Sequence, residues 1–152
     1  MEKKYIILIL LVIVGALVLI GSSFVINDKD HIKVENAKFK IPDGYSVIDV
    51  DNYYNLTNGK DSICIEKNVG NLDINSTLSN YKKIKQKENV SVEVSKFNVG
   101  SNTVYKVDSN NSGCHYWYDD NGKLYGFFTS KKSHDSDPLV VSLINSKSNS
   151  IF

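Results

Sequence analysis

Arginine is absent from this 152-residue chain, and cysteine and proline occur only twice each. All 18 basic residues are therefore lysines. Because an ammonium group lacks the planar fork of a guanidinium, bidentate phosphate or carboxylate clamps are disfavoured. Beyond the first four residues, lysines and acidic residues are equal in number. Nucleic-acid-binding proteins depend on a basic face, often rich in arginine, so the composition argues against that class.

Motifs for catalysis or metal binding are also lacking. The sequence has no His-x-x-x-His, Cys-x-x-Cys or Gly-x-Ser-x-Gly spacing, so neither a zinc site nor a serine hydrolase is indicated. The three histidines are scattered along the chain: His31, His115 and His134. Cys114 and His115 are neighbours, but adjacent strand residues point to opposite faces and cannot pair as nucleophile and base. The acidic segments 119–120 and 135–137 are more typical of solvated loops than of calcium sites. We expect no metal, no cofactor and no enzymatic activity.

One long apolar segment without charge begins at Tyr5 and ends at Ile26. At about 1.5 Å per helical residue, roughly 20 such residues cross the ~30 Å hydrocarbon layer of a membrane. Lys3 and Lys4 precede the segment, and positive residues tend to stay in the cytoplasm. The sequence thus predicts a single-pass anchor with the rest of the chain outside. A secretory signal cleaved near residues 21–23 is the alternative.

This topology divides the chain into three parts. Residues 1–26 form a cytoplasmic stub and transmembrane anchor, and residues 27–33 form a polar connector. Residues 34–152 are enough for one extracytoplasmic domain with its own core.

The predicted domain is α+β, with a mainly antiparallel sheet, one central helix and one C-terminal helix. Asn-Gly steps at residues 58–59 and 121–122 are strong hairpin signals. Apolar spacing predicts a helix over residues 76–88, capped by Asp73 or Asn75. Its inward side would carry Ile74, Leu78, Tyr81 and Ile84. Asp137-Pro138 indicates a further helix start, although the β-branched residues that follow leave a strand open. Strands are expected over residues 34–41, 51–57, 60–67, 90–97, 103–108, 114–120 and 123–129.

The hairpin signals also predict which residues share a sheet face, because a two-residue turn sets the register. For the second hairpin, one face carries Cys114, Tyr116, Tyr118, Tyr125 and Phe127. The other carries His115, Trp117, Leu124 and Phe128. For the first hairpin, one face carries Tyr54, Leu56, Ile63 and Ile65. The other carries Tyr53, Asn55 and Cys64. We expect the Ile/Leu face to be core, joined by Trp117 and Phe128. A tyrosine-rich face bearing both cysteines would remain.

This tyrosine-rich face is the predicted binding surface, because tyrosine offers a rigid contact area with a hydroxyl that can stay wet. The binding residues would be Tyr116, Tyr118, Tyr125 and Phe127, and a glycan or an envelope protein the partner. The alternative is that the C-terminal helix covers this face and makes it core. Cys64 and Cys114 both follow the predicted anchor and are candidates for a disulfide outside the reducing cytoplasm, and two separate buried thiols are the alternative.

Four sequons match the N-glycosylation pattern: Asn55, Asn75, Asn89 and Asn110. A chain this rich in asparagine and serine contains some of them by chance. The predicted topology permits glycosylation, and the motif count does not establish it.

The segment Phe39-Lys40-Ile41-Pro42-Asp43-Gly44-Tyr45 ends a strand in a Pro-x-Gly turn before an aromatic residue. With the hairpin, helix, strands and closing helix that follow, it resembles the PsbP/Mog1-type α/β/α sandwich, as in small membrane-anchored surface proteins of methanogenic archaea. The resemblance implies a binding or accessory role without catalysis. The predicted function is therefore a membrane-anchored extracytoplasmic binding or accessory module. A cysteine-dependent enzyme, secreted or anchored, and a structural envelope component are the alternatives.

Overall fold

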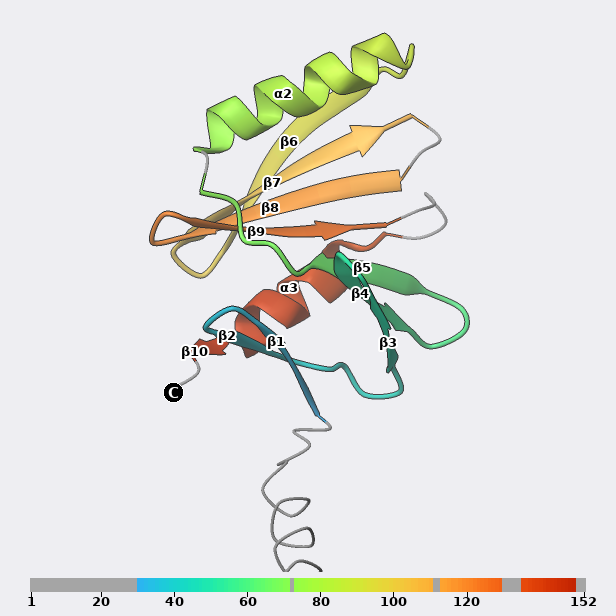
Figure 1. The fold of residues 1–152 in the computed structure, drawn as a ribbon, viewed down its shortest axis with the longest axis vertical. Coiled ribbons are helices and arrows are strands. Elements are labelled where there is room, and N and C mark those ends of the chain that lie inside the picture. Colours follow the sequence, from blue (N-terminus) through green and yellow to red (C-terminus); the bar gives the residue numbers. More distant parts are fainter. Residues whose placement is uncertain (1–29, 72, 111–112, 130–134, 150–152) are drawn as a thin grey trace, which may run out of the picture.

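The computed structural model of the chain describes residues 30–71, 73–110, 113–129 and 135–149 (Figure 1). The predicted anchor, residues 5–26, and His134 lie outside this part. Within the described ranges, no helix has the length and apolar character needed to cross a membrane.

Two antiparallel sheets and two helices make up the described domain (Figure 1). The large sheet has seven strands in the order β3-β4-β5-β9-β8-β7-β6, and the small sheet has the order β1-β2-β10. The large sheet contains β3 (Ser46–Val50), β4 (Tyr53–Thr57), β5 (Ser62–Glu66), β6 (Val92–Val99), β7 (Asn102–Ser109), β8 (Gly113–Asp120) and β9 (Lys123–Phe128). The small sheet contains β1 (His31–Val34), β2 (Ala37–Lys40) and β10 (Ser148–Asn149), and the helices are α2 (Ile74–Lys87) and α3 (Asp137–Ser146). The predicted mainly antiparallel α+β class is confirmed.

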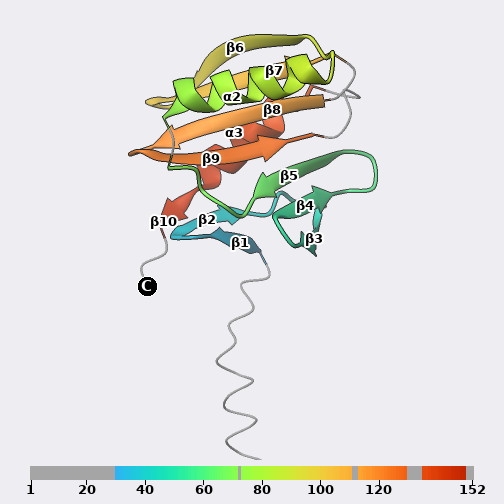
Figure 2. The same ribbon diagram turned by 45° about the horizontal axis from the view of Figure 1, so that its top comes forward.

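The helices lie on opposite faces of the large sheet (Figures 1 and 2). α3 and the small sheet cover one face and bury the main core there, which includes Phe39, Ile65, Tyr116 and Leu143. α2 lies on the other face and covers a smaller cluster of Val107, Trp117 and Leu124 with Ile74, Leu78 and Tyr81. The sheet therefore has a core on each side, but the α2 side is the smaller.

The second predicted hairpin has the expected register. Asn121 and Gly122 both have positive φ, 54° and 81°, as a two-residue turn between twisted strands requires. Asp120 pairs with Lys123 and Tyr118 with Tyr125. The first hairpin turns through four residues, because Thr57 pairs with Ser62. This changes the register by two positions, so the predicted faces are preserved.

The expectation that Trp117 and Phe128 join the Ile/Leu face in one core was wrong. Ile65 pairs with Phe127 and Cys64 with Phe128, so the isoleucines share a face with the tyrosine-rich set. Trp117 is buried, as predicted, but on the opposite face beneath α2. Each turn sets which residues share a face within its own hairpin. The register between the hairpins depends on the pairing of β5 with β9, a long-range contact that no local signal specifies.

Four local predictions also need correction. Residues 34–41 are not one strand, because Glu35 adopts a φ of 49° and the chain turns between β1 and β2. β1 begins at His31, inside the expected connector of residues 27–33. The central helix begins at Ile74, where the Asp73 side chain caps it by accepting hydrogen bonds from the Asn75 and Ser76 amides. Ile84, expected on the inward side, is 55% exposed.

The C-terminal segment is a helix, as the Asp-Pro signal predicted. Pro138 lies at its first turn, where no intrahelical N–H is needed. Its buried side chains are Val140, Leu143 and Ile144.

Candidate functional site

The predicted binding residues are buried beneath α3 and the small sheet. Tyr116 and Phe127 are fully inaccessible, and Tyr118 and Tyr125 are each only 3% exposed. Phe39 of β2 packs edge-on against Tyr125 and Phe127, with ring centroids 5.7 and 5.8 Å apart. A binding platform needs accessible rings, so the binding assignment is wrong. The alternative interpretation, in which the C-terminal helix covers this face, describes what the structure shows.

Tyr116 instead belongs to a polar contact that holds the start of α3 on the sheet. Its hydroxyl donates to Asp137 Oδ1 at 2.8 Å, and Lys106 Nζ donates to the same oxygen at 2.7 Å. Burial disfavours the phenolate, and Asp137 as hydrogen-bond acceptor adds to this, so the pKa of Tyr116 is raised far above its ordinary value. Burial of the Lys106 ammonium lowers its pKa, but the hydrogen bond and charge of Asp137 outweigh this and raise it overall. The contact is structural.

The two cysteines are free, buried and on opposite faces of the sheet, so the structure shows the alternative of two separate thiols and not the candidate disulfide. Cys114 shares the face of Tyr116, whereas Cys64 pairs with Phe128 on the α2 side. Burial raises the pKa of the Cys64 thiol to about 11. The pKa of Cys114 is also raised, by burial first and then by the charge of Asp108. Buried thiols with raised pKa values are poor nucleophiles at neutral pH.

A different surface is the better candidate. On the α2 side of the sheet, four aromatic rings follow one another across strands β4, β9 and β8, and we call them the aromatic row: Tyr53, Phe128, His115 and Trp117. Their ring centroids are 5.3 Å apart for Tyr53 and Phe128, 5.6 Å for Phe128 and His115, and 4.1 Å for His115 and Trp117. Tyr81 of α2 closes the inner end by packing edge-on against His115 and Trp117. α2 therefore covers Trp117, while Tyr53 and Phe128 remain half-buried at the outer end.

Polar side chains and an exposed aliphatic residue flank the outer end of the aromatic row. The register places Ile48, Asn55, Cys64 and Phe128 in line across β3, β4, β5 and β9, all on the α2 side. Ile48 is 52% exposed, and Asn55 is half-buried beside the Cys64 thiol. Within the described residues, this half of the sheet face has no covering helix. It is thus a partly open surface of rings, an amide and an aliphatic side chain.

Glu66 and Gly126 shape the middle of this surface. Glu66 Oε1 lies 3.2 Å from His115 Nε2, so the carboxylate reaches across β9 to the imidazole. It can do so because Gly126 has no side chain: a Cβ there would lie 2.1 Å from Glu66 Oε2. The carboxylate is one-third exposed and adds a hydrogen-bond acceptor beside the rings.

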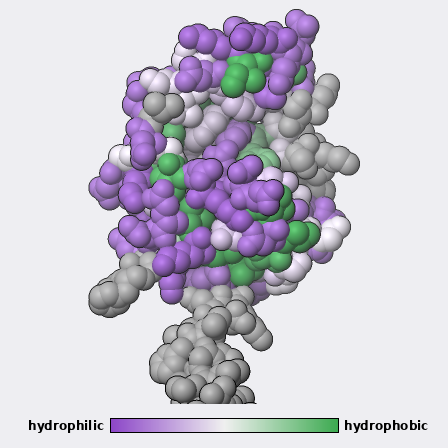
Figure 3. All heavy atoms as spheres, in the orientation of Figure 1, coloured by the Kyte–Doolittle hydropathy of each residue, from purple (hydrophilic) through white to green (hydrophobic). Residues whose placement is uncertain are grey.

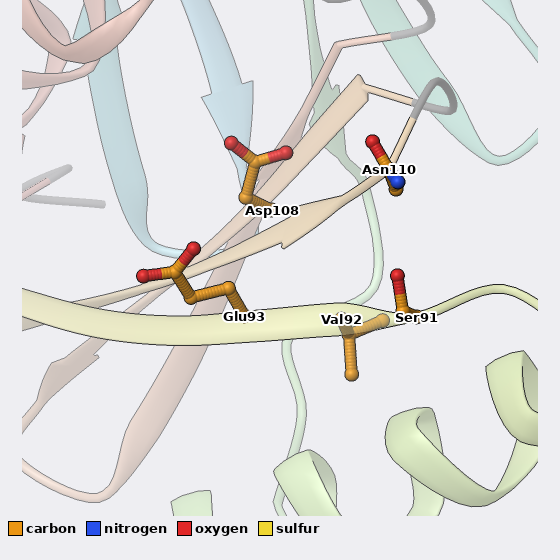
Figure 4. Close-up of a pocket in the computed structure, with 5 residues that line it drawn as sticks. All are labelled: Ser91, Val92, Glu93, Asp108 and Asn110. Atoms are coloured by element: carbon orange, nitrogen blue, oxygen red, sulfur yellow. The ribbon is translucent and has the colours of Figure 1, made fainter.

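An open pocket of about 280 Å³ lies at the end of β6 and β7, on the other side of the sheet (Figure 4). Figure 4 shows the carboxylates of Glu93 and Asp108 on one side of the strands, while Val92 points the opposite way toward α2. Ser91 and Asn110 complete the lining. The described residues contain no group of three side chains suited to hold a metal ion, and these two carboxylates alone define no ligand.

The remaining predicted acidic segments have structural partners. Asp119 accepts a hydrogen bond from the Gly122 amide in the hairpin turn, and Asp120 pairs with Lys147. Asp135 accepts from the Asp137 amide at the start of α3. These contacts explain the carboxylates without a calcium ion.

The sequons differ in accessibility. Asn75, Asn89 and Asn110 are exposed, whereas Asn55 is half-buried within β4. Glycosylation itself stays a prediction.

Comparison with known proteins yields little. Neither a family model nor a curated protein matches the sequence. Among solved structures, the fold is similar to the solution structure of cyanobacterial PsbP (CyanoP) from Synechocystis sp. PCC 6803. The TM-score is 0.46 and the identity 12%, over 81% of this chain and 89% of that chain. That neighbour is of the PsbP type predicted from residues 39–45, but the likeness is too loose to transfer any residue or activity. The resemblance to surface proteins of methanogenic archaea stays a prediction.

The sequence contained a signal for the aromatic row that the prediction did not use. The hairpin rule already placed Tyr53 with Asn55 and Cys64, and Phe128 with His115 and Trp117. The rule could not give the register between the two hairpins. That register, set by the pairing of β5 with β9, puts both sets on the same face of the sheet. The rule also could not show that α2 covers only part of that face.

Proposed function

We propose that the chain is a binding or accessory module without catalytic activity, tethered to the outer face of a membrane by residues 5–26. The observation that carries the binding role is the half-buried outer end of the aromatic row, formed by Tyr53 and Phe128. Rings with an adjacent amide and carboxylate suit an envelope glycan or a protein partner. The tether rests on the charge-free apolar segment and on the lysines before it.

The cysteine-dependent enzyme is the weaker candidate for a physical reason. A nucleophilic cysteine needs a thiolate and a base within hydrogen-bond reach. Cys64 lies two strands from His115, and its sulfur contacts the Asn55 amide oxygen at 3.8 Å. Cys114 faces the opposite core. The His115 ring stacks between Trp117 and Phe128, so the imidazole is held as part of the row.

Site-specific photo-crosslinking tests the binding surface. Tyr53 or Phe128 is replaced by photoreactive benzoylphenylalanine in the full chain in native membranes, and Tyr45, also half-buried but in the loop before β3, serves as the control position. We expect a discrete crosslinked envelope component from Tyr53 and Phe128 and none from Tyr45. The same products from all three positions, or none from the aromatic row, would refute the proposed surface.

Protease accessibility tests the tether separately. Protease added to intact cells should digest the domain and leave an anchored N-terminal fragment. Full protection would overturn the orientation, and a mature chain beginning near residue 24 would identify a cleaved signal in place of an anchor.

A further inference from the structure

Helix α2 contacts the domain along one side only. Ile74, Leu78 and Tyr81 pack on the sheet, yet no residue of the helix is fully buried. Ile84 lies off this contact line and is 55% exposed, one of two large hydrophobic side chains so exposed in the described residues. Figure 3 shows hydrophobic surface among hydrophilic side chains at this end of the molecule. The outward side of α2 thus presents an apolar side chain that the fold does not use.

Lysines are concentrated in the same half of α2 as this side chain. Lys82, Lys83 and Lys87 are exposed, and among the described residues none of them has an ion-pair partner. Lys85 is paired with Glu88 at 2.7 Å. Lys87 follows Ile84 by three residues and so adjoins it on the helix surface, and Lys83 lies one turn before Lys87 on the same side of the helix. Lys82, two residues before Ile84, projects from the opposite side. Between Ile74 and Lys87 the helix carries four lysines and no acidic residue, so α2 is a local concentration of positive charge.

The position of α2 decides which anionic partner it can meet. β1 and the start of the described chain lie at one end of the long axis, and α2 lies at the other (Figures 1 and 2). With the proposed tether before β1, α2 points away from the membrane that holds the chain. The lysines are therefore placed poorly for the lipid headgroups of that membrane.

We propose that the outward side of α2 is a docking surface for an acidic protein, with Ile84 as the apolar anchor and Lys83 and Lys87 as the charged groups beside it. An apolar anchor within a charged rim is the ordinary anatomy of a protein interface. A polyanionic chain would contact only the lysines and make no use of Ile84, so an acidic protein fits this surface better. The orientation away from the membrane rests on the proposed tether, whereas the charge and the exposed Ile84 are independent of it. The surface is distinct from the aromatic row.

Binding of a probe peptide to the full chain in nanodiscs tests the proposal. The probe is a synthetic helix of glutamates with leucines along one side, and polyglutamate and free phosphatidylglycerol vesicles are the comparison probes. The variants are Lys83→Gln/Lys87→Gln and Ile84→Ser. Matched controls are Lys33→Gln/Lys60→Gln, which removes the same charge from exposed positions elsewhere, and Ile84→Leu, which keeps an apolar side chain at the anchor.

The leucine–glutamate helix should bind, and more weakly at high salt. The α2 double variant should weaken binding about tenfold, through lost charge complementarity. Ile84→Ser should weaken it about fivefold, through lost apolar contact. Both controls should bind like the wild type. Equal losses in the control double variant, equally tight binding of polyglutamate or vesicles, or failure of the probe to bind would each overturn the proposal. Crosslinks from Tyr53 or Phe128 report on the other surface, so the two proposals fail independently.

Discussion

Replacing Tyr116 by phenylalanine removes one hydroxyl from the contact that holds the start of α3. The ring is fully buried and its packing is retained, so the variant leaves no cavity of side-chain size. The lost bond joins the hydroxyl to Asp137 Oδ1 at 2.8 Å. Hydrogen bonds to charged groups contribute about 1.5–3 kcal/mol when partly buried. Lys106 still reaches the same oxygen, so Asp137 keeps a partner and the cost should lie in the lower half of that range.

Tyr118→Phe is the matched control. Its hydroxyl accepts from Asn102 Nδ2 at 3.3 Å, a long contact between neutral groups. We expect a cost of about 0.5 kcal/mol, near the low end for a neutral hydrogen bond.

Urea unfolding followed by Trp117 fluorescence measures both variants. With unchanged slopes, Tyr116→Phe should lower the free energy of unfolding by about 1.5–2 kcal/mol, and thus the melting temperature by roughly 5–10 °C. Equal losses in the two variants would show that the Asp137 contact adds nothing to the packing of α3. A change of slope would indicate that α3 detaches before the rest of the domain unfolds.

Three further predictions concern the α2 side of the molecule. Trp117→Ala should destabilise the domain by about 3–5 kcal/mol, because the indole is buried beneath α2; a water-exposed emission maximum in the wild type would contradict this burial. Burial raises the pKa of Cys64 from 9.0 to about 11, so the associated stability is complete below about pH 9 and is lost as the pH rises toward 11. Melting temperatures at pH 7 and 10 should therefore differ less in Cys64→Ser than in the wild type, and parallel curves would refute the assignment. Asp73→Ala removes the cap of α2 and should cost about 1 kcal/mol in thermal unfolding, whereas Asp43→Ala, in an exposed turn, should be neutral.

Local signals predicted the elements well. The Asn121-Gly122 turn predicted both the register of β8 and β9 and the face of each side chain. Asp73 was one of the two caps predicted for α2, whose start lies two residues before the expected one, and the Asp137-Pro138 step marked the start of α3. Each signal acts within a few residues, because turn geometry and capping depend on neighbouring backbone groups.

The predicted site failed where distant segments meet. Within each hairpin the residues were assigned to the correct faces. The register between the two hairpins was predicted wrongly, so the face expected to be exposed is the core. A shift of one residue between strands moves a whole set of side chains to the other face. The tyrosine-rich set became core because Ile65 pairs with Phe127.

The amino-acid sequence by itself determined the α+β class, the hairpins, the two helices and the charge-free segment before the domain, because each follows from local spacing and composition. Only the tertiary structure decided that β5 pairs with β9, that the cysteines lie on opposite faces, and that α2 covers Trp117 but leaves Tyr53 and Phe128 half-buried. These outcomes depend on which apolar surfaces the folded chain can bury together. The free energy of burying apolar surface depends on contacts across the whole domain, so no single segment specifies it.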